Sequence, residues 1–146
     1  MNPHPPPYVR PVTAREAIGH LNVPGRTDER RRKELIEAWH MCPPGTSLRK
    51  AVPNVSSFES VRLHPDRPST TQTANHFNWH YAVPRYLSVE EMALIGGFPS
   101  GFRWPAGQER CKKQIGNSVP PLFMRAIAEH IQGKILSSIS GGEYAA

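Results

Sequence analysis

The stretch "CKKQIGNSVPPLFMRAIAEHI", from Cys111 to Ile131, decides the fold of this chain. It passes from a basic segment through Gly-Asn-Ser into two prolines, and it ends in apolar residues that recur every three or four positions. This spacing predicts a closing amphipathic helix that begins near Val119. The residues before the helix are expected to be a loop or strand, which makes the joint a strand-to-helix turn. The joint contains no evident acid, base or nucleophile.

The two prolines after Val119 determine how the predicted helix begins. A Ser118 N-cap would need N–H groups that these prolines lack, so Asn117 is expected to cap the helix through the N–H of Val119. The Ser118 hydroxyl is then spare, and Gly116 permits either a positive φ or the close approach of another group. Two interpretations remain open: a helix end that binds a carboxylate or phosphate, and a well-made helix start with no ligand.

Three segments of the second half of the chain resemble conserved parts of the DNA (cytosine-5)-methyltransferases. The closing stretch is similar to the last motif of that family, "RLHPDRPSTTQTA" to the preceding motif, and "YLSVEEMALIGGFPSGFRW" to the segment between them. They occur in family order over residues 61–132. Thr70 and Gln72 depart from the family pattern, which usually has a proline and an aliphatic residue there. "PVTAREAIGHL" also resembles the stretch that often opens the variable region of these enzymes.

The resemblance implies a mixed α/β fold, namely the C-terminal portion of an S-adenosylmethionine-dependent methyltransferase. A small DNA-facing domain would be followed by a helix that returns to the cofactor domain. The chain is expected to divide into a proline-rich lead-in over residues 1–12, a segment like the variable target-recognition region over 13–60, the methyltransferase segment over 61–132, and a tail over 133–146.

Two sets of candidate site residues follow from the resemblance, by position in the two motifs. The set that would line the S-adenosylmethionine site, near the methionine end of the cofactor, is Asn117, Ser118 and Val119. The set that would organise the target-recognition region or contact DNA, mainly as a scaffold, is Arg62, Arg67 and Thr71. Double-stranded DNA is the implied partner. The net charge of +6 favours a polyanionic partner, although solubility would explain it equally well.

The groups that perform the chemistry of this family do not match any part of the chain. In the family a cysteine that follows a proline attacks C6 of a flipped cytosine, and a glutamate holds the ring nitrogen. Cys42 precedes its prolines and Cys111 follows an arginine, so neither matches. The Glu-Asn-Val and Gln-x-Arg-x-Arg motifs and the glycine-rich cofactor loop are also absent. No catalytic residue is therefore assigned, and we expect the chain to need an N-terminal methyltransferase segment or subunit.

A different class of function stays open beside the enzymatic one. The chain could be a non-enzymatic basic DNA-binding or interaction module, or a truncated remnant of such an enzyme. The cation run Arg30–Lys33 is expected to be a solvated helix face, and His76 with His80 are not expected to bind a metal, because no nearby Cys or Glu completes a site. Trp79 and Tyr81 could stack on a base, but core packing is the favoured interpretation.

The remaining patterns predict helices, loops and location. Capping boxes at Thr13–Glu16 and Ser88–Glu91 predict two short helices that end at glycines, and a longer helix with a packed Trp39 is predicted between them; residues 45–60 are expected to be a loop. The sixteen prolines predict a loop-rich domain. The two cysteines show no C-x-x-C pair, no apolar run is long enough for a membrane span, and the start lacks a signal peptide, so a cytoplasmic location without membrane contact is expected.

Overall fold

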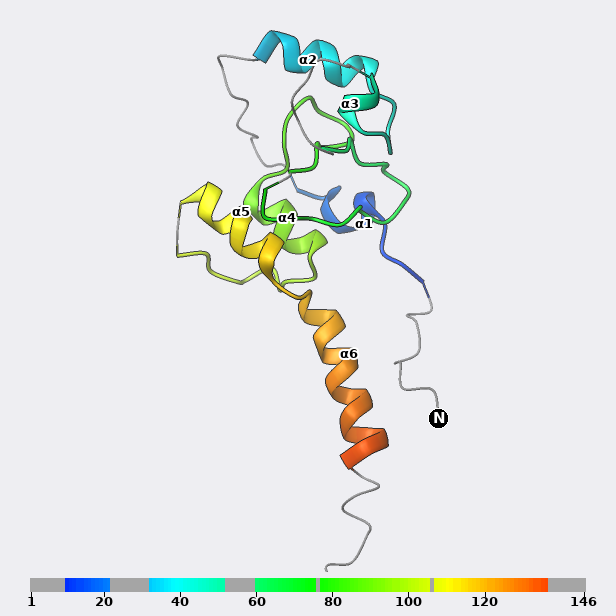
Figure 1. Cartoon of the computed structure of the whole chain (residues 1–146), viewed down its shortest axis with the longest axis vertical. Coiled ribbons are helices and arrows are strands. Elements are labelled where there is room, and N and C mark those ends of the chain that lie inside the picture. The colour runs from blue at the N-terminus through cyan, green and yellow to red at the C-terminus, as the bar shows by residue number, and fades with distance from the viewer. Residues whose placement is uncertain (1–9, 22–31, 52–59, 76, 106, 137–146) are drawn as a thin grey trace, which may run out of the picture.

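The computed structural model describes residues 10–21, 32–51, 60–75, 77–105 and 107–136. Figure 1 shows short helices set among long loops, with one helix that projects away from the rest. The helices are α1 (Ala14–Ile18), α2 (Arg32–Met41), α3 (Leu48–Ala51), α4 (Val89–Ile95), α5 (Gln108–Asn117) and α6 (Pro121–Ile131), and a π-helical turn (Gln132–Leu136) continues α6. Within these ranges no helix has the length and apolarity to cross a bilayer.

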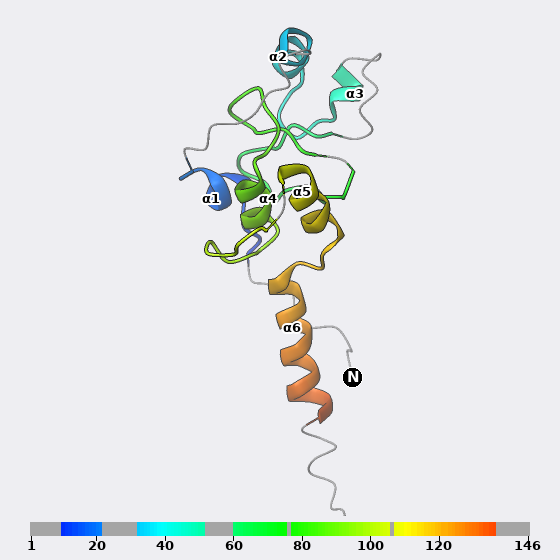
Figure 2. The same cartoon turned by 90° about the vertical axis from the view of Figure 1, so that its left-hand side faces the viewer.

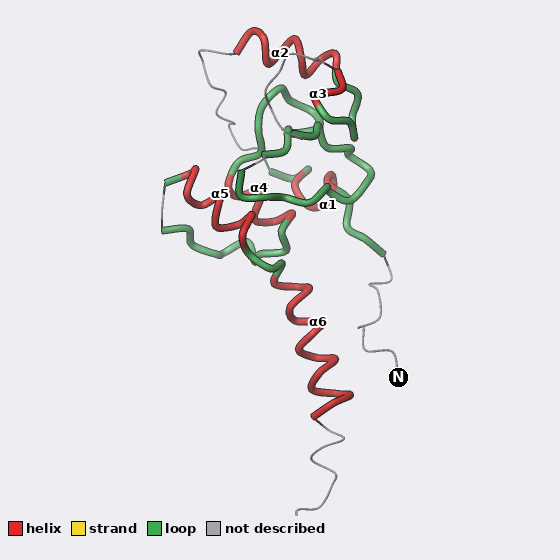
Figure 3. The backbone as a smooth tube through the Cα atoms, in the orientation of Figure 1, coloured by secondary structure: helices red, strands yellow, loops and turns green. Residues whose placement is uncertain are grey.

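The extended segments are joined by single bridges rather than by a sheet. In the described ranges, Figure 3 shows only helices and loops. The isolated bridges pair Ser47 with Val61, Arg62 with Trp79, and Trp79 with Tyr86. The strands expected for a mixed α/β fold are therefore not found in this part of the chain. Prolines at 65, 68 and 84 remove backbone donors that longer ladders would need.

Both predicted capping boxes are confirmed. At α1 the Thr13 hydroxyl accepts the N–H of Glu16 at 3.3 Å, and the Glu16 carboxylate accepts the N–H of Thr13 at 2.9 Å. At α4 the corresponding distances between Ser88 and Glu91 are 3.1 Å and 2.8 Å. Each box satisfies two backbone donors that a helix start leaves unpaired, which explains why helices of only 5 and 7 residues form where the sequence places them.

Two expectations about loops were wrong. The segment before the double proline is not a strand or loop but α5, in which Cys111 is buried. Its residues, "QERCKKQIGN", are mostly good helix formers, and this local preference prevails. The short helix α3 also interrupts the loop expected over residues 45–60, of which the structure describes 45–51 and residue 60. The joint therefore connects two helices.

The described core consists of two clusters of buried side chains. The first joins α1, α4 and α5 and contains Ala14, Ile18, Leu63, Leu87, Met92, Ala93 and Ile115. The second lies under α2 and α3 and contains Ala38, Trp39, Cys42, Leu48 and Trp79. The core interpretation of Trp39 and Trp79 is confirmed, and Tyr81 packs against the first cluster.

Helix α6 stands apart from both clusters. The two perpendicular views in Figures 1 and 2 agree that it points away from the remaining helices. It begins at Pro121, two residues after the predicted start, and none of its residues is buried. Leu122, Phe123 and Met124 are each about half exposed, at 51%, 52% and 47%. Helix α6 packs against the π-helical turn that follows it, and Leu122 in its first turn also contacts Gly97, just after α4.

Candidate functional site

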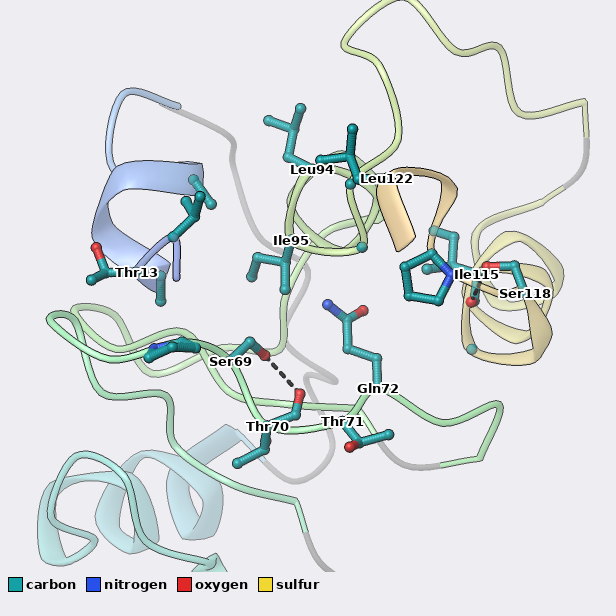
Figure 4. Close-up of a pocket in the computed structure, with 18 residues that line it drawn as sticks. Thr13, Ser69, Thr70, Thr71, Gln72, Leu94, Ile95, Ile115, Ser118 and Leu122 are labelled. Carbon is teal, nitrogen blue, oxygen red and sulfur yellow. Dashed lines mark hydrogen bonds between the residues drawn. The ribbon is translucent and has the colours of Figure 1, made fainter. Parts of the chain in front are cut away.

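An open cleft lies where the two family-like motifs meet (Figure 4), and its volume is about 540 Å³. Four segments line it: the start of α1, the loop over residues 68–72, the end of α4, and the joint between α5 and α6. Its apolar walls include Ala17, Leu94, Ile95 and Leu122, and its polar groups are hydroxyls and one amide. No charged side chain is among the lining residues.

The joint between α5 and α6 differs from the one predicted. Asn117 is the last residue of α5 and does not cap α6, whose N-cap is Pro120 without any side-chain hydrogen bond. Ser118 instead closes α5, because its hydroxyl donates to the Ile115 carbonyl at 2.7 Å and its N–H donates to the same oxygen at 3.1 Å. The hydroxyl is therefore not spare as a donor. Its lone pairs remain able to accept a hydrogen bond from a ligand.

Gly116 makes the close approach that was one of its two predicted uses. A Cβ atom built on Gly116 would lie 2.3 Å from the carbonyl carbon of Thr73 and 2.4 Å from the nitrogen of Ala74. Its φ is not positive: among the described glycines only Gly45 and Gly97 have a positive φ. The missing side chain thus lets the last motif touch the backbone of the preceding motif directly.

The predicted site residues are only partly brought together. Ser118 and Thr71 line the cleft, whereas Asn117 and Val119 are exposed but are not among its lining residues. Arg67 is exposed, and its carbonyl accepts the N–H of Ala14 at 2.9 Å, which ties this loop to α1. The cleft therefore combines one residue from each predicted set.

Arg62 is engaged by the protein itself. Its Nη1 atom donates to the carbonyls of Trp39 and Cys42 at 3.2 and 2.9 Å, and its Nε and Nη2 atoms donate to the Tyr81 carbonyl at 3.2 and 3.0 Å. The guanidinium lies over the Trp39 ring at 3.5 Å, and burial lowers the pKa of Arg62. With these donors directed at backbone carbonyls, Arg62 ties the end of α2 to the loop that contains Tyr81.

A buried ionic network centred on Glu91 has no signature among the sequence motifs. The Glu91 carboxylate is fully buried in α4 and accepts hydrogen bonds from both Nη atoms of Arg85 at 2.7 Å. It also accepts the N–H of Ser88, which caps the helix. The Nε2 atom of His80 lies 3.6 Å from Glu91 Oε1, and the N–H of Ala82 donates to His80 Nδ1 at 3.0 Å. Only the capping role of Glu91 was visible in the sequence, because its charged partners come from a separate loop.

Burial and partners displace the pKa values in this network. Burial lowers the pKa of His80, with Glu91 opposing and Arg85 assisting, and the acceptor role of Nδ1 also favours the neutral ring. Burial would raise the pKa of Glu91, but hydrogen bonds from Arg85 and Ser88 outweigh it and the pKa lies below its ordinary value. Burial likewise lowers the pKa of the neighbouring Lys112, against the attraction of Glu91.

These shifts predict that acid destabilises the chain in two stages. His80 is protonated in the unfolded chain below its ordinary pKa of 6.5 but resists protonation when folded, so the free energy of unfolding falls as the pH drops below that value. Glu91 adds a second fall below its ordinary pKa of 4.5. Denaturant titrations from pH 7.5 down to 3 should show both stages in the wild type. His80→Gln should flatten the first stage only, while His20→Gln, at an exposed position, should keep the wild-type profile; an unchanged profile in His80→Gln would contradict the assignment.

Two sequence predictions fall partly outside the described residues. The structure does not describe His76, so the spacing between His76 and His80 is not known. Across the described ranges, no group of three His, Cys, Asp or Glu side chains could hold a metal ion. Arg30 and Arg31 of the cation run also lie outside the described residues.

Comparison with known proteins places the chain in a family. The sequence model of the C-5 cytosine-specific DNA methylase family matches residues 14–133. The Type II methyltransferase M.BbvI of Brevibacillus brevis is 30% identical over 135 residues, which cover 82% of this chain and 36% of that protein. M.AgeI of Thalassovita gelatinovora, also a Type II methyltransferase, is 42% identical over 76 residues, or 49% of this chain and 18% of that protein.

A solved structure agrees with these sequence relatives. It is a crystal structure of a protein described as a DNA modification methyltransferase encoded within an E. coli prophage, with a TM-score of 0.60 and 26% identity over 75% of this chain and 28% of that chain. The chain thus spans about a third or less of the length of the relatives it matches. Since the family description covers most of the 146 residues, the chain belongs to the C-5 cytosine-specific DNA methylase family.

Proposed function

We propose that this chain supplies the C-terminal part of a DNA (cytosine-5)-methyltransferase, and that it helps to bind double-stranded DNA and completes the S-adenosylmethionine site. The catalytic cysteine and glutamate would come from an N-terminal methyltransferase segment or subunit. The main support for the proposal is the exposure of α6: its apolar side chains are exposed, and none of its residues is buried. An apolar face of this kind marks an interaction site in a soluble protein.

The orientation of α6 supports docking rather than fraying. Leu122, in its first turn, packs against Gly97, where a Cβ atom would lie 3.3 Å from the leucine side chain. Gly97 has a φ of 79°, a conformation that L residues other than glycine rarely adopt. Proline at the first helical position and a proline N-cap stiffen the entry to α6. The helix is thus presented in a defined direction, with its apolar face available to a partner.

The residues at the joint fit a contribution to a cofactor site. Asn117, Ser118 and Val119 are all exposed, and they correspond by position to the motif that lines the S-adenosylmethionine site in the family. The cofactor supplies the methyl group for C5 of cytosine. Because the Ser118 hydroxyl already donates to Ile115, it would accept a hydrogen bond from a donor on the cofactor, whereas the Asn117 amide can donate and accept.

Double-stranded DNA is the proposed nucleic-acid partner. The net charge of +6 supports it, and Arg67 is exposed on the motif that organises the target-recognition region in the family. Arg62 is proposed as a scaffold residue, since the four hydrogen bonds of its guanidinium go to backbone carbonyls. Thr71 is exposed and lines the cleft, so its hydroxyl could either support the target-recognition region or contact DNA.

Substitution on α6 tests the proposal. Phe123→Asp should weaken binding of the complementary methyltransferase part by about 30-fold or more, because a half-exposed aromatic anchor becomes a charge in an apolar interface. The probe is the part of M.BbvI that this chain does not match, and the readouts are calorimetric affinity and methyl transfer to unmethylated plasmid DNA. Ala128→Asp places the same charge on the other side of α6 and should bind as the wild type does.

The outcome also separates the two classes of function. Methyl transfer that requires both parts, and that Phe123→Asp abolishes, supports the enzymatic proposal. DNA binding by the chain alone, with no effect of the complementary part or of S-adenosylmethionine, would favour the non-enzymatic DNA-binding module instead.

A further inference from the structure

One polar atom in the cleft lacks the partner that buried polar atoms normally have. The Gln72 side chain points from the loop over residues 68–72 toward the end of α4 (Figure 4). Its Nε2 atom donates to the Met92 carbonyl at 3.3 Å, so the amide nitrogen must face that oxygen. The Oε1 atom is then buried, and among the described residues it has no hydrogen-bond partner. Buried acceptors without partners are rare and call for a physical reason.

We infer that this cleft is a docking slot for an extended segment of the complementary methyltransferase part, with the Gln72 Oε1 atom accepting a backbone N–H from it. The inference rests on the proposed function, because it needs that partner. An extended segment offers a backbone donor for Gln72 together with an apolar side chain for the walls formed by Leu94, Ile95 and Leu122.

The chemistry of the lining favours a polypeptide over a small ionic ligand. None of the lining side chains is charged, so the cleft offers no counterion to the ammonium, carboxylate or sulfonium groups of S-adenosylmethionine. Ser118 belongs both to the cleft and to the proposed cofactor-facing surface of the joint, because it lines the cleft and is exposed. The rest of the cleft suits a neutral chain segment.

The cleft is also continuous with the exposed face of α6. Leu122 lines the cleft, yet it is 51% exposed in the first turn of that helix. Val12, another residue that lines the cleft, is 62% exposed. A partner that covers α6 therefore reaches the cleft at Leu122, and the two-thirds of M.BbvI that this chain does not match provides ample polypeptide for it.

Gln72→Leu tests the hydrogen bond to the partner without lowering the stability of the isolated chain. Leucine keeps the volume and removes the unpaired acceptor, and the Met92 carbonyl keeps the N–H of Gly96 at 2.9 Å as its donor. The isolated variant should therefore melt at the wild-type temperature or higher, while its affinity for the complementary part of M.BbvI falls roughly ten-fold or more. Gln114→Leu, the same change at an exposed position on α5, should alter neither quantity.

A second variant tests the slot without touching Gln72. Val12→Asp puts a carboxylate on the exposed rim and should weaken the same association, whereas Val83→Asp, at an exposed position outside the cleft, should not. If Phe123→Asp weakens binding but Gln72→Leu and Val12→Asp do not, the slot is wrong and the proposed function stands. If the wild type does not bind the complementary part, both fail. Binding of S-adenosylmethionine by the isolated chain that Gln72→Leu abolishes would assign the cleft to a small ligand and overturn the inference.

Discussion

Glu91→Ala should lower the free energy of unfolding by about 3–5 kcal/mol, which is a large part of the total stability of a domain this size. The substitution leaves the Arg85 guanidinium buried without the carboxylate that binds both its Nη atoms at 2.7 Å. It also removes the acceptor for the Ser88 N–H, so α4 loses half of its capping box. Chemical denaturation followed by circular dichroism measures the change.

Two further variants identify the cause. Glu90→Ala changes the neighbouring acidic residue of α4, which is exposed, and should shift the free energy of unfolding by no more than about 0.5 kcal/mol. The double variant Arg85→Met/Glu91→Leu removes both buried charges and should recover most of the stability lost in Glu91→Ala. If the double variant is as unstable as the single one, the loss comes from packing or capping and not from the unpaired cation.

The helix starts were predictable because their signals are local. A Ser or Thr followed three residues later by Glu determines its own hydrogen bonds, and both such pairs form as predicted. The closing helix was found within two residues by its apolar spacing. These features depend on residues close together in the chain, so they could be predicted without knowledge of distant contacts.

The joint and the network were not predictable, because each depends on contacts across the chain. The prolines indicated correctly that Ser118 does not cap α6, but the predicted Asn117 cap does not form. The Ser118 hydroxyl instead binds the end of α5, a helix that the loop prediction excluded. Arg62 was expected to act mainly as a scaffold residue, but the carbonyls that its guanidinium binds, those of Trp39, Cys42 and Tyr81, could not be identified from the sequence. Such carbonyls have no signature in sequence, because every residue has one.

Gly116→Ala should destabilise the chain by about 3 kcal/mol or more, against the direction that helix propensity alone predicts. Gly116 lies inside α5, where alanine is ordinarily better than glycine by about 1 kcal/mol. Here the new methyl group would lie 2.3 Å from the carbonyl carbon of Thr73 and 2.5 Å from its oxygen. Both are backbone atoms and cannot move aside as a flexible side chain would, so α5 must separate from the loop of the preceding motif.

The sign of the change in stability shows whether Gly116 is only a weak helix former or is needed for the close contact with the Thr73 backbone. Gly101→Ala is the matched control, since nothing lies within 4 Å of its added Cβ atom and its stability should change little. Thermal and urea unfolding of both variants provide the comparison. Stabilisation by Gly116→Ala would mean that the two motifs do not touch in solution. Destabilisation would show that the contact between them is direct, and because Gly116, Ser118 and Gln72 all line the cleft, the same variant should also weaken association with the complementary methyltransferase part.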